Sequence, residues 1–160
     1  MIPFEVVPTR EYSVEELKEE FERLKANVDL NKAQSELTYD DENIEEEMQK
    51  QAGLYFYYSL LRNQAKALYE RADILLGNLK ADRDLVVRKY MVEKEMRITD
   101  TAVKATVERS DSVRELSFLK LEIGEVLAML DTVVKALEHK KDMMTQTSAN
   151  HRRMVESNFL

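Results

Sequence analysis

Few of the side chains that perform catalysis or bind metals occur in this sequence. Its 160 residues contain no cysteine and only two histidines, His139 and His151. Neither histidine has a glutamate or second histidine at the helical spacings that metal-binding bundles use. The glycines Gly53, Gly77 and Gly124 stand alone within helical patterns, so no glycine-rich phosphate loop is expected. We therefore expect no catalytic residue, no metal site and no cofactor, and a function in binding.

Basic side chains form a more informative pattern. At about 100° per residue, they fall within roughly a third of the circumference of one helix, apart from its apolar positions. The stripe consists of Arg62, Lys66, Lys80, Arg83 and Lys94. Such a stripe is typical of a surface that binds nucleic-acid phosphates. It is also typical of the solvated flank of a coiled coil, and periodicity alone favours that simpler interpretation.

An aromatic cluster precedes the basic stripe, in the run Leu54-Tyr55-Phe56-Tyr57-Tyr58. Because consecutive residues point all around a helix, these rings cannot all face one core. Packing in a core or subunit interface is the expected role for most of them. Tyr55 lies off the apolar repeat, so it is the best candidate for stacking on an unpaired base.

Composition predicts an all-α protein. There are three glycines and two prolines, Pro3 and Pro8, and 44% of the residues are hydrophobic. No secretion signal and no apolar run of membrane-spanning length is recognisable, so we expect a cytoplasmic protein without membrane contact. The net charge is −7, yet residues 62–97 hold 9 basic and 6 acidic side chains, a local charge of +3. Overall acidity therefore does not exclude a local nucleic-acid site.

Two regions are expected along the chain. Residues 1–42 form the first, with an extended arm at 1–12, an acidic helix at 14–27 and an irregular segment at 29–42. Ser13 and Glu16 have the spacing of a capping box at the start of that helix. Residues 43–160 form the second, a long antiparallel helical hairpin with helices at 43–96 and 112–147, a helical linker and a patternless tail at 148–160.

The long helix at 43–96 carries an apolar 3.5-residue repeat, which is typical of packing against a partner helix. Its members are Leu54, Tyr58, Leu61, Ala65, Leu68, Ala72, Leu75 and Leu79. Asp82 takes the next apolar position, so a bend or register change is expected near 77–82. Val86 and Tyr90 are expected to resume the repeat.

The helix at 112–147 has an apolar face that is too wide for one neighbouring helix. We therefore expect a second subunit to cover part of it, giving a homo-oligomer. The residues expected at that oligomer interface are Leu127, Leu130, Val134 and Leu137.

The order of these elements resembles the UvsY family of recombination mediators from large tailed phages. The resemblance covers most of the chain and rests on order and spacing. It includes the acidic helix SVEELKEEFERLKANVDL, the Leu54-Tyr55 element with Leu60 and Leu61, the linker TAVKATVERSDSV and the segment LAMLDTVVKALEHKKDMM.

This resemblance implies a ring-like homo-oligomer whose C-terminal helix drives assembly. It also implies binding to single-stranded DNA, and help for a RecA-like recombinase that replaces the single-strand-binding protein. The family's DNA contacts correspond to the basic positions Lys80, Arg83, Arg88 and Lys89. This chain departs from the family there, because Ala81, Asp82 and Asp84 interrupt the basic run.

Two functions thus remain open. The first is a mediator that binds single-stranded DNA without a catalytic step. The second is a coiled-coil adaptor or chaperone that binds proteins and whose basic stripe is only solvated. Only the mediator predicts DNA affinity that falls as salt rises.

Overall fold

The computed structural model describes residues 12–40 and 43–158. Within these residues the chain is helical and contains no strand, as the composition predicts. The helices are α1 (Val14–Asn27), α2 (Leu30–Glu36), α3 (Ile44–Glu93), α4 (Asp100–Glu108) and α5 (Asp111–Asn158). The arm expected before residue 12 lies outside the described residues.

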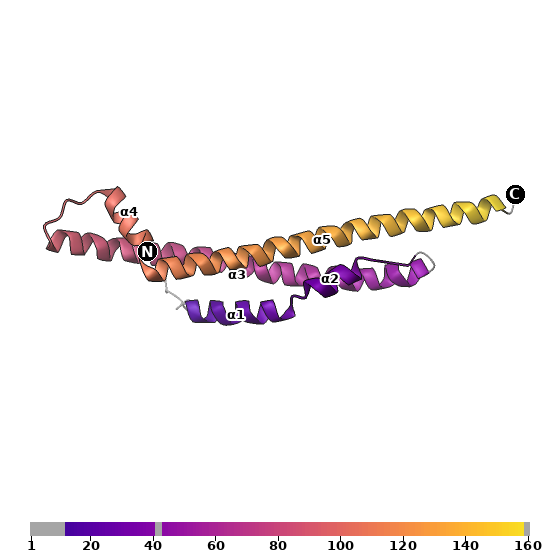
Figure 1. Ribbon diagram of the computed structural model, residues 1–160, viewed down its shortest axis with the longest axis horizontal. Coiled ribbons are helices and arrows are strands. Elements are labelled where there is room, and N and C mark those ends of the chain that lie inside the picture. Colours follow the sequence, from indigo (N-terminus) through magenta and orange to yellow (C-terminus); the bar gives the residue numbers. More distant parts are fainter. Residues whose placement is uncertain (1–11, 41–42, 159–160) are drawn as a thin grey trace, which may run out of the picture.

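Helices α3 and α5 form the expected antiparallel hairpin, which gives the molecule its elongated shape (Figure 1). The apolar repeat of α3 faces α5, and Tyr58, Leu61, Ala65, Leu68 and Ala72 are all buried. The seam then shifts by one residue, because Leu76 is buried whereas Leu75 is only half-buried. This shift, close to the predicted register change, is the drift of a straight helix relative to a strict 3.5-residue repeat.

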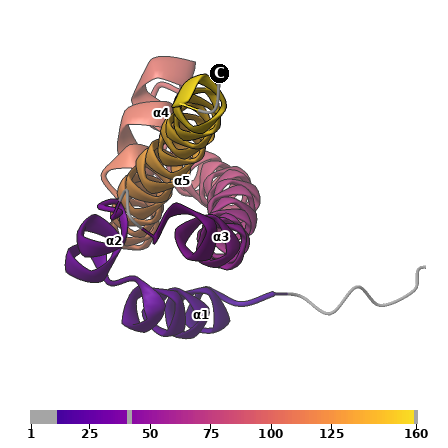
Figure 2. The same ribbon diagram turned by 90° about the vertical axis from the view of Figure 1, so that its right-hand side faces the viewer.

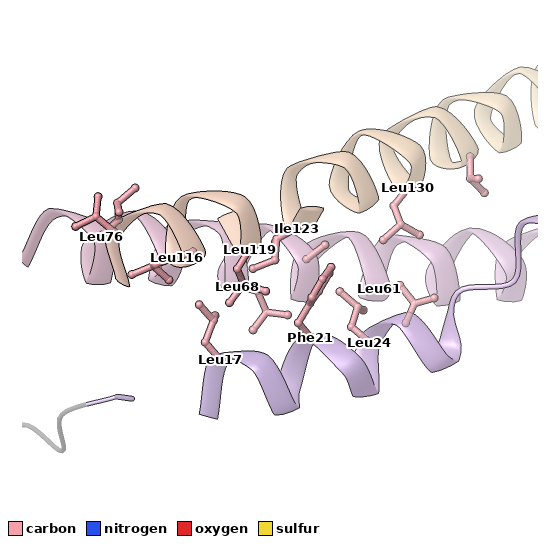
Figure 3. Packing of buried hydrophobic residues seen from close by; sticks show 14 of the residues in the cluster. Leu17, Phe21, Leu24, Leu61, Leu68, Leu76, Leu116, Leu119, Ile123 and Leu130 are labelled. Carbon is pink, nitrogen blue, oxygen red and sulfur yellow. The ribbon is translucent and has the colours of Figure 1, made fainter. Parts of the chain in front are cut away.

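Helix α1 lies alongside the hairpin and supplies a third side to its core (Figure 1 and Figure 2). The capping box is present, since the Ser13 hydroxyl accepts from the Glu16 amide and the Glu16 carboxylate accepts from the Ser13 amide. Leu17, Phe21 and Leu24 point into the space between α3 and α5 (Figure 3). The chain's own first helix thus covers part of the wide apolar face that suggested a second subunit.

Helix α2 occupies part of the segment that was predicted to be irregular. The Asp29 side chain caps it by accepting from the Lys32 amide, and Ala33 is buried. This segment has too few apolar residues to show a helical repeat, which explains why the sequence did not predict α2. Its end is fixed by Lys140 of α5, whose ammonium donates to the carbonyl oxygens of Glu36 at 2.7 Å and Thr38 at 3.1 Å.

Lys140 is itself buried, and its charge is balanced by the Glu47 carboxylate at 3.3 Å. We expect Lys140→Ala to destabilise the fold by about 2–4 kcal/mol, because two carbonyls and a carboxylate lose their partner. Urea unfolding followed by circular dichroism measures this. Lys141→Ala is the matched control: its side chain is exposed and its pairing with Asp142 spans 4.0 Å, so a change within about 0.5 kcal/mol is expected. Equal effects of the two substitutions would contradict the anchoring role.

Helix α3 ends without glycine or proline. Glu95 adopts the left-handed conformation with φ of 53°, and the Met96 amide donates to the Met91 carbonyl at 2.9 Å. The Glu95 amide donates to the Val92 carbonyl, which completes the hydrogen-bond pattern of a Schellman motif. The chain then returns through α4, whose Thr99 cap accepts from the Ala102 amide.

The two long helices are offset, so α3 extends beyond the first residue of α5 (Figure 1). Helix α4 covers one side of this extension, where Met91, Val103 and Val107 are buried. The prediction that Val86 and Tyr90 resume the packed seam is wrong, because both are more than half exposed. No α5 residue lies opposite them, since α5 begins only at Asp111.

The C-terminal segment also differs from expectation. Helix α5 continues to Asn158, through most of the tail that was predicted to lack pattern. Met144 is fully buried, whereas Met154 and Val155 are exposed. The last helical turns therefore continue by local propensity rather than by burial of an apolar face, which is why no amphipathic pattern marks them.

Candidate nucleic-acid interface

The first two members of the basic stripe are paired with carboxylates. Arg62 on α3 donates from its Nε to the Asp131 carboxylate on α5. Lys66 lies 4.0 Å from the Glu70 carboxylate one turn further along α3. These two positions match the coiled-coil flank interpretation, because each cation already has a counter-charge.

Tyr55 lies in an unfavourable electrostatic setting for a phosphate. Its ring is 39% exposed, and its hydroxyl donates to the Glu138 carboxylate on α5 at 3.0 Å. Phe56 is more exposed, at 71%, but residues 51–61 contain no charged side chain. Neither ring has a cation as a sequence neighbour, and the Glu138 carboxylate would repel a phosphate close to Tyr55.

Arg88 connects two helices. Its guanidinium donates to Asp84 at 2.6 Å on the same helix and to Asp100 at 2.8 Å in α4. Hydrogen bonds to Asp84 and then to Asp100 raise the pKa of Arg88. This side chain thus holds α4 against α3, and its charge is matched by two carboxylates.

The remaining basic positions differ from these three. Among the described residues, no carboxylate forms an ion pair with Lys80, Arg83 or Lys89. Arg83 and Lys89 are exposed, and Lys80 is half-buried. The structure therefore divides the predicted site: Arg62, Lys66 and Arg88 are ion-paired, whereas the other three cations are left available to a ligand.

An aromatic ring lies between such cations on the extension of α3. Arg83, Val86, Tyr90 and Lys94 follow one another at steps of three and four residues, so they share a side of the helix, which we call the overhang face. Arg83 and Tyr90 lie one and two heptads after the buried Leu76. The overhang face is therefore the continuation of the core seam beyond the point where α5 covers it.

The exposure of Tyr90 was not predicted from the sequence. Its heptad position suggested packing, yet the ring is 55% exposed. Arg83 and Lys94, seven residues before and four after Tyr90, form no ion pair with any residue that the structure describes. The sequence did contain one indication that Tyr90 is exposed, namely these two cations on the same side of the helix, because unpaired charges are seldom buried between packed helices.

The local charge supports the same surface. Residues 80–97 hold six basic and four acidic side chains, a net charge of +2. Two of the four acids are Asp82 and Asp84, and Asp84 is already paired with Arg88. The overhang face thus combines an exposed ring with available positive charge, the combination that single-stranded nucleic acids require.

The residues expected at the oligomer interface lie in or beside the core of the single chain. Leu130, Val134 and Leu137 are buried within the single chain, and Leu127 is half-buried against the same core. Their burial is complete or nearly so before any second subunit is added. The buried members of this set would reach a partner only if the hairpin opened, and the interface at these residues stays a prediction.

Comparison with known proteins adds no relative: no protein-family model, curated protein or solved structure matches the chain. The resemblance to the mediator family therefore stays a prediction. In the described part of the chain, no three histidine, aspartate or glutamate side chains are grouped as ligands for a metal ion. No helix there is both long and apolar enough to cross a membrane.

Proposed function

We propose that this protein binds single-stranded DNA through the overhang face of α3. The observation that carries the proposal is Tyr90, an exposed ring between Arg83 and Lys94 on the part of α3 that extends beyond the first residue of α5. An unpaired base stacks on an aromatic ring, and the adjacent cations attract the flanking phosphates. Lys89 and Lys80 lie beside this face and extend the positive surface.

The same surface favours single strands over duplex DNA. In a duplex the base faces are stacked on one another and are not accessible to Tyr90. The overhang face also presents only a few cations, so charge alone gives a weak site. Stacking therefore supplies the preference for the unpaired strand, at about 1–3 kcal/mol for each base that stacks on a ring.

Such a site suits a recombination mediator of the UvsY type. We propose that a homo-oligomer holds one strand on several weak sites at once and gains affinity through their number. A strand held this way fits the single-strand-binding protein less well, which favours its replacement by a RecA-like recombinase. No catalytic step belongs to this proposal.

The test is a titration of a fluorescent oligodeoxythymidine with the full chain at several salt concentrations, with duplex DNA of equal length as control. We expect preference for the single strand, and a logarithmic affinity that falls linearly with log salt by about 0.7 for each phosphate contact. Equal binding of single strand and duplex would contradict the role of Tyr90.

Absence of binding at low salt would favour the other function, a protein-binding adaptor. One observation supports that alternative: α3 exposes Phe56, Ile74, Leu85 and Val92 on a side away from its core seam. Apolar residues at such helical spacings are typical of a face that packs on a partner helix. The expected activity would then be binding to a protein, with an affinity that does not depend on salt, in place of binding to DNA.

A further inference from the structure

The side of α5 that faces away from α3 carries a second ordered pattern, which we call the outer stripe. It is defined over residues 121–143, where its members lie within roughly 40° of Thr132 around the helix at about 100° per residue. They are Leu121, Glu125, Ala128, Thr132, Ala136, His139 and Met143. None of them is buried, and the two large apolar ends, Leu121 and Met143, are 62% and 56% exposed.

The outer stripe is symmetric about Thr132. Alanines lie four residues to either side, at Ala128 and Ala136. An acid and an imidazole lie seven residues to either side, at Glu125 and His139. Two large apolar side chains lie eleven residues to either side, at Leu121 and Met143. In an antiparallel pair of such helices, each residue of the outer stripe would therefore face a residue of similar size or of complementary chemistry.

We propose that the outer stripe binds a second copy of this chain, with the two α5 helices antiparallel and a two-fold axis at Thr132. In a two-fold interface, residue i contacts residue j and j contacts i. This axis places Leu121 against Met143 and Glu125 against His139, each pair occurring twice. Apolar groups thus meet apolar groups, and each carboxylate meets an imidazole that donates to it.

The centre of the outer stripe fits close packing. Ala128, Thr132 and Ala136 have small side chains, and the Thr132 hydroxyl is already satisfied by donating to the Ala128 carbonyl at 3.0 Å. Small residues allow two helix axes to approach to the short end of the range of about 8–10 Å. From Leu121 to Met143 the contact extends over roughly 33 Å at 1.5 Å per residue.

A second copy accounts for this pattern better than a parallel pair or an unrelated helix. A parallel pair in register would place Glu125 on Glu125 and His139 on His139, which opposes like groups. Binding of an unrelated helix would not require Glu125 and His139 to lie at equal distances from Thr132. The arrangement is also independent of the proposed DNA site, since it uses the outer side of α5 and no residue of the overhang face.

The chain's lack of cysteine makes a direct test possible, because one introduced thiol can react only with its copy in another subunit. With Thr132 on the axis, Thr132→Cys is expected to form a disulfide-linked dimer under mild oxidation. Thr145→Cys is the matched control. Thr145 is an exposed threonine on the same helix, its hydroxyl donates to the Lys141 carbonyl at 2.9 Å, and it lies about 140° from the stripe. Cross-linking of both variants at the same rate would overturn the proposal.

Mass in solution provides a second measurement that does not depend on DNA. We expect the wild-type chain to have at least twice its 18.7 kDa monomer mass, and Leu121→Glu to halve the mass of the oligomer while its helix content by circular dichroism stays unchanged. Glu125→Lys should weaken association at least tenfold, and adding His139→Glu should restore it by reversing both partners. A wild-type mass that Leu121→Glu leaves unchanged would rule out this interface, whatever the outcome of the DNA titration.

Discussion

Leu130→Asp should unfold the hairpin rather than dissociate an oligomer. Leu130 is completely buried between α3 and α5 at the centre of the core. The substitution removes a buried leucine and places a carboxylate where the surrounding core is apolar. Together these effects exceed about 4 kcal/mol, which is a large part of the stability of a domain of this size. Circular dichroism and urea unfolding should show loss of the cooperative transition.

The same substitution at Leu85 is the control for this result. Leu85 lies on α3 of the same hairpin but is 62% exposed, so Leu85→Asp should change the free energy of unfolding by no more than about 0.5 kcal/mol. If Leu130→Asp instead gave a folded protein of halved mass, then Leu130 would lie between subunits. The sequence-based interface at Leu127, Leu130, Val134 and Leu137 would then be correct.

Features that depend on neighbouring residues were predictable from the sequence. The capping box at Ser13 requires only two side chains three residues apart, and it is present. The first helix begins and ends where its pattern predicts. The hairpin followed from the same kind of reasoning, because the 3.5-residue repeat of α3 specifies a partner over many turns.

Features that depend on distant residues were not predictable. The apolar face of α5 was predicted to be wide, but the sequence does not reveal that α1 lies along the hairpin and places Phe21 in the same core. The prediction of a second subunit at Leu130 followed from that missing contact. Likewise, α3 ends at a left-handed Glu95, a position where glycine is the usual signal and where this chain has none.

The candidate site shows the same limit. Spacing placed Arg62 and Arg83 on one stripe, yet only the structure shows that Asp131 of α5 neutralises Arg62 and that no described carboxylate pairs with Arg83. Tyr90 has the heptad position of a packed residue, and its exposure results from the offset between α3 and α5. The length of the linker through α4 sets that offset, and no local pattern encodes it.

A triple variant of the overhang face, Arg83→Glu, Tyr90→Ala and Lys94→Glu, should reduce affinity for single-stranded DNA by on the order of a hundredfold or more. Loss of stacking on Tyr90 contributes about 1–3 kcal/mol. Reversal of the two cations removes two phosphate contacts and adds repulsion, so the salt slope should flatten by about 1.4. All three side chains are exposed, so the unfolding transition should stay nearly unchanged.

The control for this variant must alter charge equally without touching the overhang face. Arg152→Glu with Arg153→Glu does so, because both side chains are exposed near the end of α5 and the net charge again falls by four. If affinity depended only on the overall charge of −7, the two variants would weaken binding alike. A much larger loss from the overhang variant would locate the bound strand on α3, because only there do the lost charges flank a ring on which a base can stack.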